Sequence, residues 1–499
     1  MQQRKTGAVL SYVNIVLKNS INLLYTPFLL RFLGNAEYGI YQLAIQVVST
    51  LSLLALGFSG AYVRFYWKLK KEKNESVDAL NGLYLTIFSV ISFLSLILGG
   101  ILVFFVPVFF GNTFTHQEIT ITRVLFGIMV FNVALTFPSS VFDSYIIANQ
   151  QFKFQQIRAL LGTILQPILT IPMLFLGFRS ISILSVQTLI TIIFLIANVH
   201  FSISKLNMKF RFNQYPAGLL RSLFIFSSFL LINDIVDIIN NNVPGIIIGG
   251  LVGAKAIAIY GIAIQIRTMF IQLSLALSNV FIPRINEIVN FNDSQSDLLN
   301  LMIKVGRLQL FILSTIYCGF ALVGNFFLEQ WAGSGFGLSY WMILLMILPV
   351  MVPLSQNLGI EIQRAKNMHQ FRSWILALLA IFNLLITFYS VKKWGVIGAT
   401  FGYIFSVVLG NGLLINLYNH YKVGLNMITY WKKVINVLVP NFISLLILSI
   451  IKLCFPIHSF IVFIGYGIVY LIIVFIIAWN FTLNNYEKEI ISRRFSNNS

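Results

Sequence analysis

The sequence is poor in charged residues: Asp, Glu, Lys and Arg make up 10% of its 499 residues, whereas 58% are hydrophobic. A soluble domain of ordinary composition is about a quarter charged, because charged side chains cover its surface. Short alternating segments typical of membrane β-barrel strands are also absent. Instead, apolar runs of roughly 20 residues, the length of a membrane-crossing helix, recur along the whole chain. These features exclude a soluble enzyme and predict an all-α polytopic membrane protein.

Cysteine is nearly missing, and the residue patterns of metal and nucleotide chemistry are missing altogether. Cys318 and Cys454 lie far apart in apolar runs, which favours buried thiols over a disulfide or metal pair. The five histidines are scattered over loops and helix ends, without metal-ligand spacing. A Gly-rich phosphate loop ending in Lys-Ser or Lys-Thr is absent, which excludes an ATPase engine within this chain. We therefore expect no catalytic residue, no metal and no cofactor.

Acidic residues are also few: 15 Asp and Glu accompany 34 Lys and Arg, which gives a net charge of +19. No basic motif interleaved with aromatic residues occurs on a soluble module, so nucleic acid is not an expected partner. With the N-terminus inside, 25 of the 34 basic residues lie at cytoplasmic helix ends and loops. The exceptions are six on the outer side and three within spans: Arg31, Arg179, Lys255, Lys392, Lys393 and Lys452, then Lys18, Arg123 and Arg267. This bias follows the positive-inside rule and predicts that both termini are cytoplasmic.

The hydrophobic runs predict about fourteen membrane-spanning helices joined by short connections. The run after Arg4 and Lys5 is too long for a cleavable signal segment, so we expect it to remain as the first span. The predicted spans are residues 8–32, 39–64, 80–108, 119–147, 156–177, 181–202, 222–248, 254–281, 301–324, 338–363, 372–391, 395–418, 431–453 and 457–480.

Two stretches of sequence recur at nearly the same offset. Gly34–Gln46 shares Gly, Tyr, Ala, Ile and Gln with Gly253–Gln265, 219 positions later, and Ala148–Phe154 resembles Ala365–Phe371 at an offset of 217. Chance likeness between apolar helices is the alternative explanation. A spacing of six helices preserves orientation, so the matches predict two parallel repeats related by an axis along the membrane normal. We expect an N-lobe at 1–210 (helices 1–6), a C-lobe at 211–420 (helices 7–12), and an appended pair, helices 13 and 14, at 421–499.

Polar residues inside the predicted spans form two equivalent faces. Ionisable groups facing lipid cost several kcal/mol, so they normally face a cavity or a partner. The first face has Asn14, Lys18 and Asn22 at i, i+4 and i+8, and the second has Asn233, Asp237 and Asn241 one repeat later. Asp234 lies on an adjacent stripe, and Gln42, Gln46, Gln265 and Arg267 extend the same lining. We expect these faces to line a central cleft.

Two interpretations of the charged members stay open. In the first, Lys18 and Arg267 contact an anionic group of a transported cargo, and Asp234 or Asp237 takes part in ion coupling or gating. In the second, Lys18 and Asp237 form a structural ion pair that never touches cargo. Arg64, near the cytoplasmic end of the second span, is either a further cargo contact or a topology anchor.

The segment Leu33-Gly-Asn-Ala-Glu-Tyr-Gly-Ile-Tyr41 resembles the polysaccharide-exporter branch of the multidrug/oligosaccharidyl-lipid/polysaccharide (MOP) superfamily, which includes the O-antigen flippases of the Wzx type. The likeness covers nearly the whole chain, including Gly57–Gly60, Val63–Phe65, Pro283-Arg284 and Ala365–Asn367. It implies a MATE-like fold in which two six-helix bundles form a V-shaped cleft, with two extra C-terminal helices outside.

The same resemblance implies a function and a site. Such proteins flip undecaprenyl-diphosphate-linked oligosaccharide (O-antigen, capsule or exopolysaccharide repeat units) across the inner membrane by alternating access. Cleft cations would engage the pyrophosphate, and Lys18, Arg64 and Arg267 are the candidates here, with Gln46, Gln265, Asn22 and Asn241 as further substrate contacts. The implied partners are the lipid-linked oligosaccharide, the bilayer, and a polysaccharide polymerase and chain-length regulator.

Three other functions are weighed against this one. A peptidoglycan lipid-precursor flippase or a cation antiporter of the same superfamily is the nearest alternative, although fourteen spans disfavour the twelve-span antiporter plan. A membrane polysaccharide polymerase or ligase is also basic and polytopic, but it carries a large periplasmic loop that this sequence lacks. A scaffold without a transport role leaves the paired intramembrane polar faces unexplained.

Overall fold

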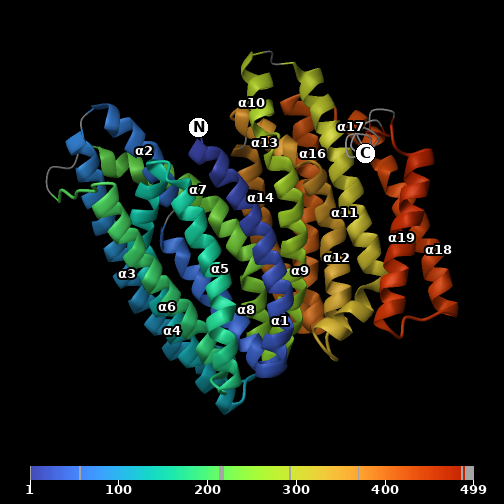
Figure 1. The fold of residues 1–499 in the computed structure, drawn as a ribbon, viewed down its shortest axis with the longest axis horizontal. Coiled ribbons are helices and arrows are strands. Elements are labelled where there is room, and N and C mark those ends of the chain that lie inside the picture. The colour runs from blue at the N-terminus through green and yellow to red at the C-terminus, as the bar shows by residue number, and fades with distance from the viewer. Residues whose placement is uncertain are drawn as a thin grey trace. The chain divides into compact units, whose positions relative to one another are not determined.

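The computed structural model describes residues 2–55, 58–72, 74–212, 218–291, 294–368, 370–484 and 487–488. Throughout these residues the chain is helical and has no strand, which confirms the all-α prediction (Figure 1). It groups into two compact units, one made of Met1–Gly261 with Leu384–Ala399 and the other of Ile262–Asn383 with Thr400–Ser499. The three-part division at 1–210, 211–420 and 421–499 stays a prediction.

Eleven helical segments in the described residues are long and apolar enough to cross a bilayer, which supports a multi-pass membrane protein. Val13–Lys71 and Gln370–Val423 each contain two predicted spans, so only the predicted span 222–248 has no counterpart among them. That run is interrupted at Asn242, which separates α7 (Leu219–Asn241) from α8 (Val243–Leu251). Pro244 starts α8, because the first turn of a helix tolerates a residue without an N–H.

The first unit is built from α1 to α8 and the start of α9. Its α1 (Gln2–Thr50) covers the first predicted span and the start of the second, and it kinks at Gly34, whose φ of 74° lies in the left-handed region. The predicted second span is then interrupted by a 3-10 turn at Leu51–Ala55 before α2 begins. The remaining helices are α2 (Phe58–Glu72), α3 (Asn74–Phe110), α4 (His116–Ala148), α5 (Phe152–Phe175), α6 (Arg179–His200) and α9 (Ala254–Asn279).

Aromatic side chains from α2, α3 and α4 form a buried core in the first unit. Tyr62 and Tyr84 meet edge to face with ring centroids 4.8 Å apart, a geometry that aromatic quadrupoles favour. The Tyr62 hydroxyl donates to Asn81, whose amide in turn donates to the carbonyl of Lys209. This chain of hydrogen bonds fixes the segment that follows α6 to the α2–α3 hairpin.

A buried carboxylate holds the kinked part of α1 against α6. Glu37, only 7% exposed, accepts hydrogen bonds from the backbone N–H of Ser180 (2.9 Å) and from its hydroxyl (2.5 Å). The Nε atom of Arg179 lies 3.3 Å from the same carboxylate. An anion is stabilised at this position because the first N–H groups of a helix have no intrahelical acceptor. Glu37 therefore has a structural role within Leu33–Tyr41.

The second unit contains the rest of α9 and the helices that follow, apart from the end of α14. Polar residues bridge the break between α12 and α13: Gln356 and Trp431 both donate to Asn416 Oδ1, at 3.1 and 3.0 Å. Gln363 of α13 donates to Asn419 at 2.6 Å, so side-chain hydrogen bonds join α13 to the segments around Asn416 and Asn419. The helices are α10 (Ile282–Phe291), α11 (Gln295–Trp331), α12 (Gly337–Ser355), α13 (Asn357–Ala365), α14 (Gln370–Trp394), α15 (Ala399–Ser406), α16 (Ile415–Tyr418), α17 (Met427–Val434), α18 (Val439–Cys454) and α19 (Phe460–Phe481).

The last two long helices, α18 and α19, pack on α11 through Cys318, Leu322, Leu448, Tyr466, Tyr470 and Val474. The segment after α19 is held by Arg307 of α11, whose side chain is 8% exposed. Its guanidinium donates to both carboxylate oxygens of Glu487 (2.7 and 3.0 Å) and to the carbonyls of Lys433 and Thr482 (2.6 and 2.9 Å). A planar donor fork suits this bidentate pairing better than an ammonium does.

We predict that Glu487→Gln destabilises the protein by about 1–3 kcal/mol, the range for hydrogen bonds to charged groups. Burial, the largest influence, raises the pKa of Glu487, but hydrogen bonds from Arg307 and the N–H of Asn484 together with the Arg307 charge outweigh it and lower that pKa below 4.5. The stabilisation by ionised Glu487 is therefore complete above about pH 4.5 and lost as the pH falls through the lowered pKa. Thermal unfolding of purified wild type and variant across this range measures the effect, and their difference should shrink with acidification.

The exposed pair Arg284–Glu287 is the matched control, with side chains 59% and 54% exposed. Because exposed ion pairs contribute little, Glu287→Gln should change stability by less than about 0.5 kcal/mol. Equal losses in the two variants would contradict a special role for the Arg307–Glu487 pair.

Candidate functional site

The nine residues predicted to line a site fall in both units. Seven belong to the first unit: Lys18, Asn22, Gln46, Arg64, Asp234, Asp237 and Asn241; Gln265 and Arg267 belong to the second. The side chain of Asn233, predicted on the same face as Asp237, lies outside the described residues.

Lys18 is exposed on the first half of α1. It lies roughly 24 Å along the helix from the kink at Gly34, at about 1.5 Å per residue, well inside the apolar segment that begins at Val13. Within the described residues it makes no hydrogen bond or ion pair, so a Lys18–Asp237 pair is not observed. Asn14, one turn earlier, accepts from Thr163 of α5 at 3.3 Å, so part of this polar face serves helix packing.

The acidic side chains of α7 are exposed, and whether they line a cleft stays a prediction. Asp234 and Asp237 are both exposed, and Asn241 donates to the carbonyl of Asp237 one turn earlier at 2.8 Å. Arg64 is exposed on α2, on the side opposite the buried aromatic core. These charged groups are therefore accessible in the first unit.

Gln46 and Asn22 are more enclosed than Lys18 and Arg64. Gln46 is 7% exposed, and its backbone carbonyl accepts from Asn242 at 3.4 Å. Its side-chain Oε1 is buried and accepts no hydrogen bond from any described residue. The carbonyl of Asn22, a partly buried residue, accepts from the hydroxyl of Thr26 at 2.8 Å.

Arg267 is buried in the second unit, with 1% of its surface exposed. Its guanidinium stacks on the ring of Tyr403 from α15, 4.2 Å from the centroid, and one nitrogen lies 3.7 Å from the sulfur of Met346 in α12. Such stacking stabilises a cation that has little access to water. In this conformation Arg267 is not accessible to a cargo, whereas Lys18 is.

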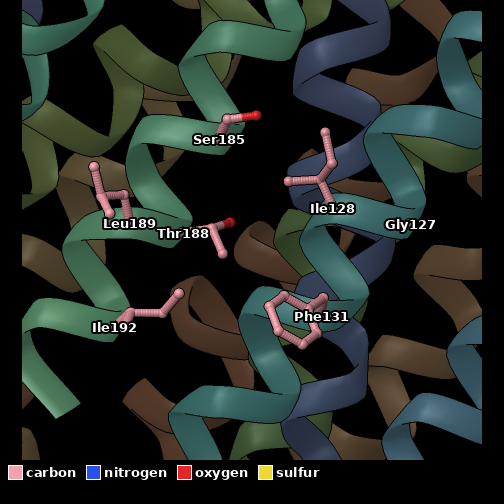
Figure 2. Close-up of a pocket in the computed structure, with 7 residues that line it drawn as sticks. All are labelled: Gly127, Ile128, Phe131, Ser185, Thr188, Leu189 and Ile192. Atoms are coloured by element: carbon pink, nitrogen blue, oxygen red, sulfur yellow. The ribbon is translucent and has the colours of Figure 1, made fainter. Parts of the chain in front are cut away.

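A groove of about 430 Å³ lies between α4 and α6 in the first unit (Figure 2). None of the nine predicted residues lines it. The Thr188 hydroxyl at its wall already donates to the carbonyl of Leu184 and receives the Asn132 amide. The groove is therefore better suited to bind a hydrocarbon chain than a sugar or a phosphate. Its lining is Gly127, Ile128, Phe131, Ser185, Thr188, Leu189 and Ile192.

Sequence reasoning missed Tyr403 and Met346, the contacts of Arg267. An aromatic ring in an apolar helix carries no local signal that it faces a cation from another helix. It also missed the glycines in and just after α8, although Gly245, Gly249 and Gly253 recur at i, i+4 and i+8, a spacing of small residues that is readable in the sequence.

Residues 28–336 match the family model described as "Polysaccharide biosynthesis protein". The chain belongs to this family. A curated Shigella flexneri protein named "Putative O-antigen transporter" is 21% identical over 412 residues, covering 78% of this chain and 92% of that protein. The family predicted from Leu33–Tyr41 is thereby confirmed.

Solved structures confirm the predicted MOP-type fold. The lipid II flippase MurJ in an inward closed conformation superposes with a TM-score of 0.72 at 17% identity, covering 95% of this chain and 99% of that one. The MATE multidrug transporter DinF-BH gives a TM-score of 0.55 at 13% identity, with coverages of 84% and 95%. At these identities the likeness establishes the fold of this family member.

We predict that the Arg267 stack depends on the aromatic face of Tyr403 rather than on its hydroxyl. Tyr403→Phe keeps the face and should leave the thermal stability of the purified protein near wild type. Tyr403→Leu removes the cation–π contact of a desolvated arginine and should destabilise the protein by roughly 1–2 kcal/mol beyond any packing loss. A Tyr403→Leu/Arg267→Met double mutant isolates the coupling, and additive effects of the two changes would rule out the stack as a stabilising contact.

Proposed function

We propose that this family member is a flippase that moves undecaprenyl-diphosphate-linked oligosaccharide across the bacterial inner membrane by alternating access. The observation that carries the proposal is the state of Lys18. It is an exposed cation inside an apolar span with no ion pair to any described residue. Facing lipid, such a group would cost several kcal/mol, so its exposure is best explained by a water-filled path for an anionic cargo.

The chemistry of the cargo fits this placement. Sugar hydroxyls cost several kcal/mol each when stripped of water, so the headgroup needs a hydrated route while the lipid tail stays in the bilayer. A diphosphate is held by charge-assisted hydrogen bonds from Lys or Arg, and an ammonium can release it more readily than a bidentate guanidinium. Lys18 and Arg64 are the accessible cations for this role, and Asn22, Asn241, Gln46 and Gln265 are the candidate contacts for sugar hydroxyls.

Arg267 enters this scheme at a later step. Because it is buried against Tyr403 in this conformation, it meets the diphosphate only after the second unit rearranges. Asp234 and Asp237 are exposed carboxylates in the first unit and are the candidates for ion coupling or gating. The chain itself transports and catalyses no covalent step; a polysaccharide polymerase and a chain-length regulator act with it.

A second candidate function is the flipping of a peptidoglycan lipid precursor. The observation that favours it is the TM-score of 0.72 to the lipid II flippase MurJ. Complementation separates the two, since a precursor flippase restores growth to cells depleted of their own lipid II flippase. A polysaccharide flippase restores only surface polysaccharide in a strain that lacks its exporter.

We predict that Lys18→Gln lowers export of lipid-linked oligosaccharide by roughly 10–100-fold, the effect of losing one or two hydrogen bonds to a charged group. Protein abundance and thermal stability should stay near wild type, because Lys18 makes no hydrogen bond or ion pair with a described residue. Surface polysaccharide in a complemented exporter-null strain measures the effect. Lys18→Arg, which keeps the charge, should retain most export.

Lys153→Gln, at an exposed lysine near the start of α5, is the matched control for loss of one positive charge and should export normally. If the Lys18→Gln variant exported as much as the wild type, Lys18 would have no role in cargo binding, and that part of the proposal would be refuted.

We also predict the orientation of the chain from its charge bias: residues 66–78 and 486–499 are cytoplasmic, while 110–117 and 326–336 face the periplasm. In a background without Cys318 and Cys454, a single cysteine at position 70 should resist an impermeant thiol reagent in intact cells. A cysteine at position 112 should react. The opposite labelling pattern would invert the topology.

A further inference from the structure

The two copies of the repeated segment lie against each other in the first unit. Each copy begins at a glycine in the left-handed region, with φ of 74° at Gly34 and 119° at Gly253. Gly34 kinks α1, and Gly253 separates α8 from α9. The 219-residue offset thus relates two equivalent backbone turns, each followed by a helix in which the sequence match extends to Gln46 or Gln265.

Residues that occupy the same position in the two copies meet in this contact. A Cβ atom built on Gly39 would lie 2.0 Å from the carbonyl oxygen of Ala254 and 3.1 Å from the nitrogen of Ala258, its repeat equivalent. A Cβ built on Gly261 would lie 3.2 Å from Cγ and 3.7 Å from Cβ of Gln42, again its equivalent. Equivalent residues can meet in this way only where a local two-fold axis passes between them.

The short helix α8 continues this contact. A Cβ on Gly245 would lie 1.6 Å from Oε1 of Gln46, so the glycine is required for the close approach. One turn further along α8, the carbonyl of Gly249 accepts from the hydroxyl of Thr113 at 2.7 Å. We call the set Gly39, Gln42, Gln46, Gly245, Ala258 and Gly261 the glycine seam.

The interactions across the seam are suited to being broken repeatedly. They consist of van der Waals contacts between backbones and small residues, and no ion pair between described residues crosses it. Gln46, which is more than nine-tenths buried, points Oε1 at Gly245 and receives no hydrogen bond there from a described residue. A buried acceptor without a donor raises the free energy of the closed form, and water satisfies it once the seam parts. The closed form is therefore closely packed, but its contacts stabilise it only weakly.

We propose that the glycine seam is the seal that closes the translocation path next to the Gly34 kink of α1, and that the seam must separate in every transport cycle. This inference rests on the proposed flippase function and adds which residues form the seal. Equivalent residues of the two copies form the seal, because they meet across the two-fold axis that relates the copies. One separation of the two copies therefore opens the whole seal.

A reversible cross-link tests this directly. The 3.7 Å between Cβ positions at Gln42 and Gly261 is within the range of a disulfide, so Gln42→Cys/Gly261→Cys in a background without Cys318 and Cys454 should oxidise readily. We expect the oxidised protein to lose export and the reduced protein to regain it. The two single-cysteine variants should export in both redox states.

Gly99→Cys/Val130→Cys is the matched control. It joins α3 to α4 within the first unit, where a Cβ on Gly99 would lie 3.0 Å from that of Val130. This disulfide should leave export intact, because α3 and α4 need not separate. Full export by the oxidised Gln42→Cys/Gly261→Cys protein would overturn the seal, whereas absence of export by the wild type itself would refute the flippase function instead.

A measurement that needs no cargo completes the test. Spin labels at Arg31 of α1 and Lys255 of α9, both exposed, report the separation of the two helical segments in lipid nanodiscs. A parting seam gives a second, longer distance population, and the Gln42→Cys/Gly261→Cys disulfide should abolish it. A single distance with and without the cross-link would contradict the proposal.

Discussion

The constraint on which this structure depends is that a polar group inside an apolar span must find either a partner or water. The protein meets it in different ways at different places. Glu37 is satisfied by the first turn of α6, and Arg307 by a carboxylate and two carbonyls. Arg267 is covered by an aromatic ring, and Lys18 alone among these is left exposed within its span. The places where the constraint is relaxed are therefore the places where function is to be sought.

Much of the fold could be predicted from sequence because a bilayer enforces helices and sets their length. Hydrophobic runs locate the helices, but hydropathy carries no signal for the breaks within the runs 39–64, 222–248 and 338–363. The repeat could be read because Gly34 and Gly253 are needed for the same backbone turn. The sequence could not show that the two copies face each other. A sequence match shows which residues are equivalent, but not whether they are in contact.

Sequence reasoning singled out Lys18 as a candidate site residue, but it could not identify what surrounds Arg267. A lone Lys18 in an apolar run is visible in sequence, since its desolvation cost demands an explanation. The partner of Arg267 is not, because Tyr403 resembles any other interfacial aromatic and is brought near only by tertiary packing. Glu37 lay within the motif that indicates the family, yet its role as an anchor for α6 follows from hydrogen bonds that no local pattern specifies.

The contrast between the two cations gives the cycle an order. Lys18 is exposed while Arg267 is stacked on Tyr403, so only one of them can meet an anion in the conformation seen here. If both were exposed together, a diphosphate bridged between them would be bound more tightly and released more slowly, which opposes turnover. Sequential exposure avoids this trap, because the anion leaves one cation as it gains the next. In the proposed flippase cycle, the rearrangement that uncovers Arg267 would therefore carry the cargo into the second half of its path.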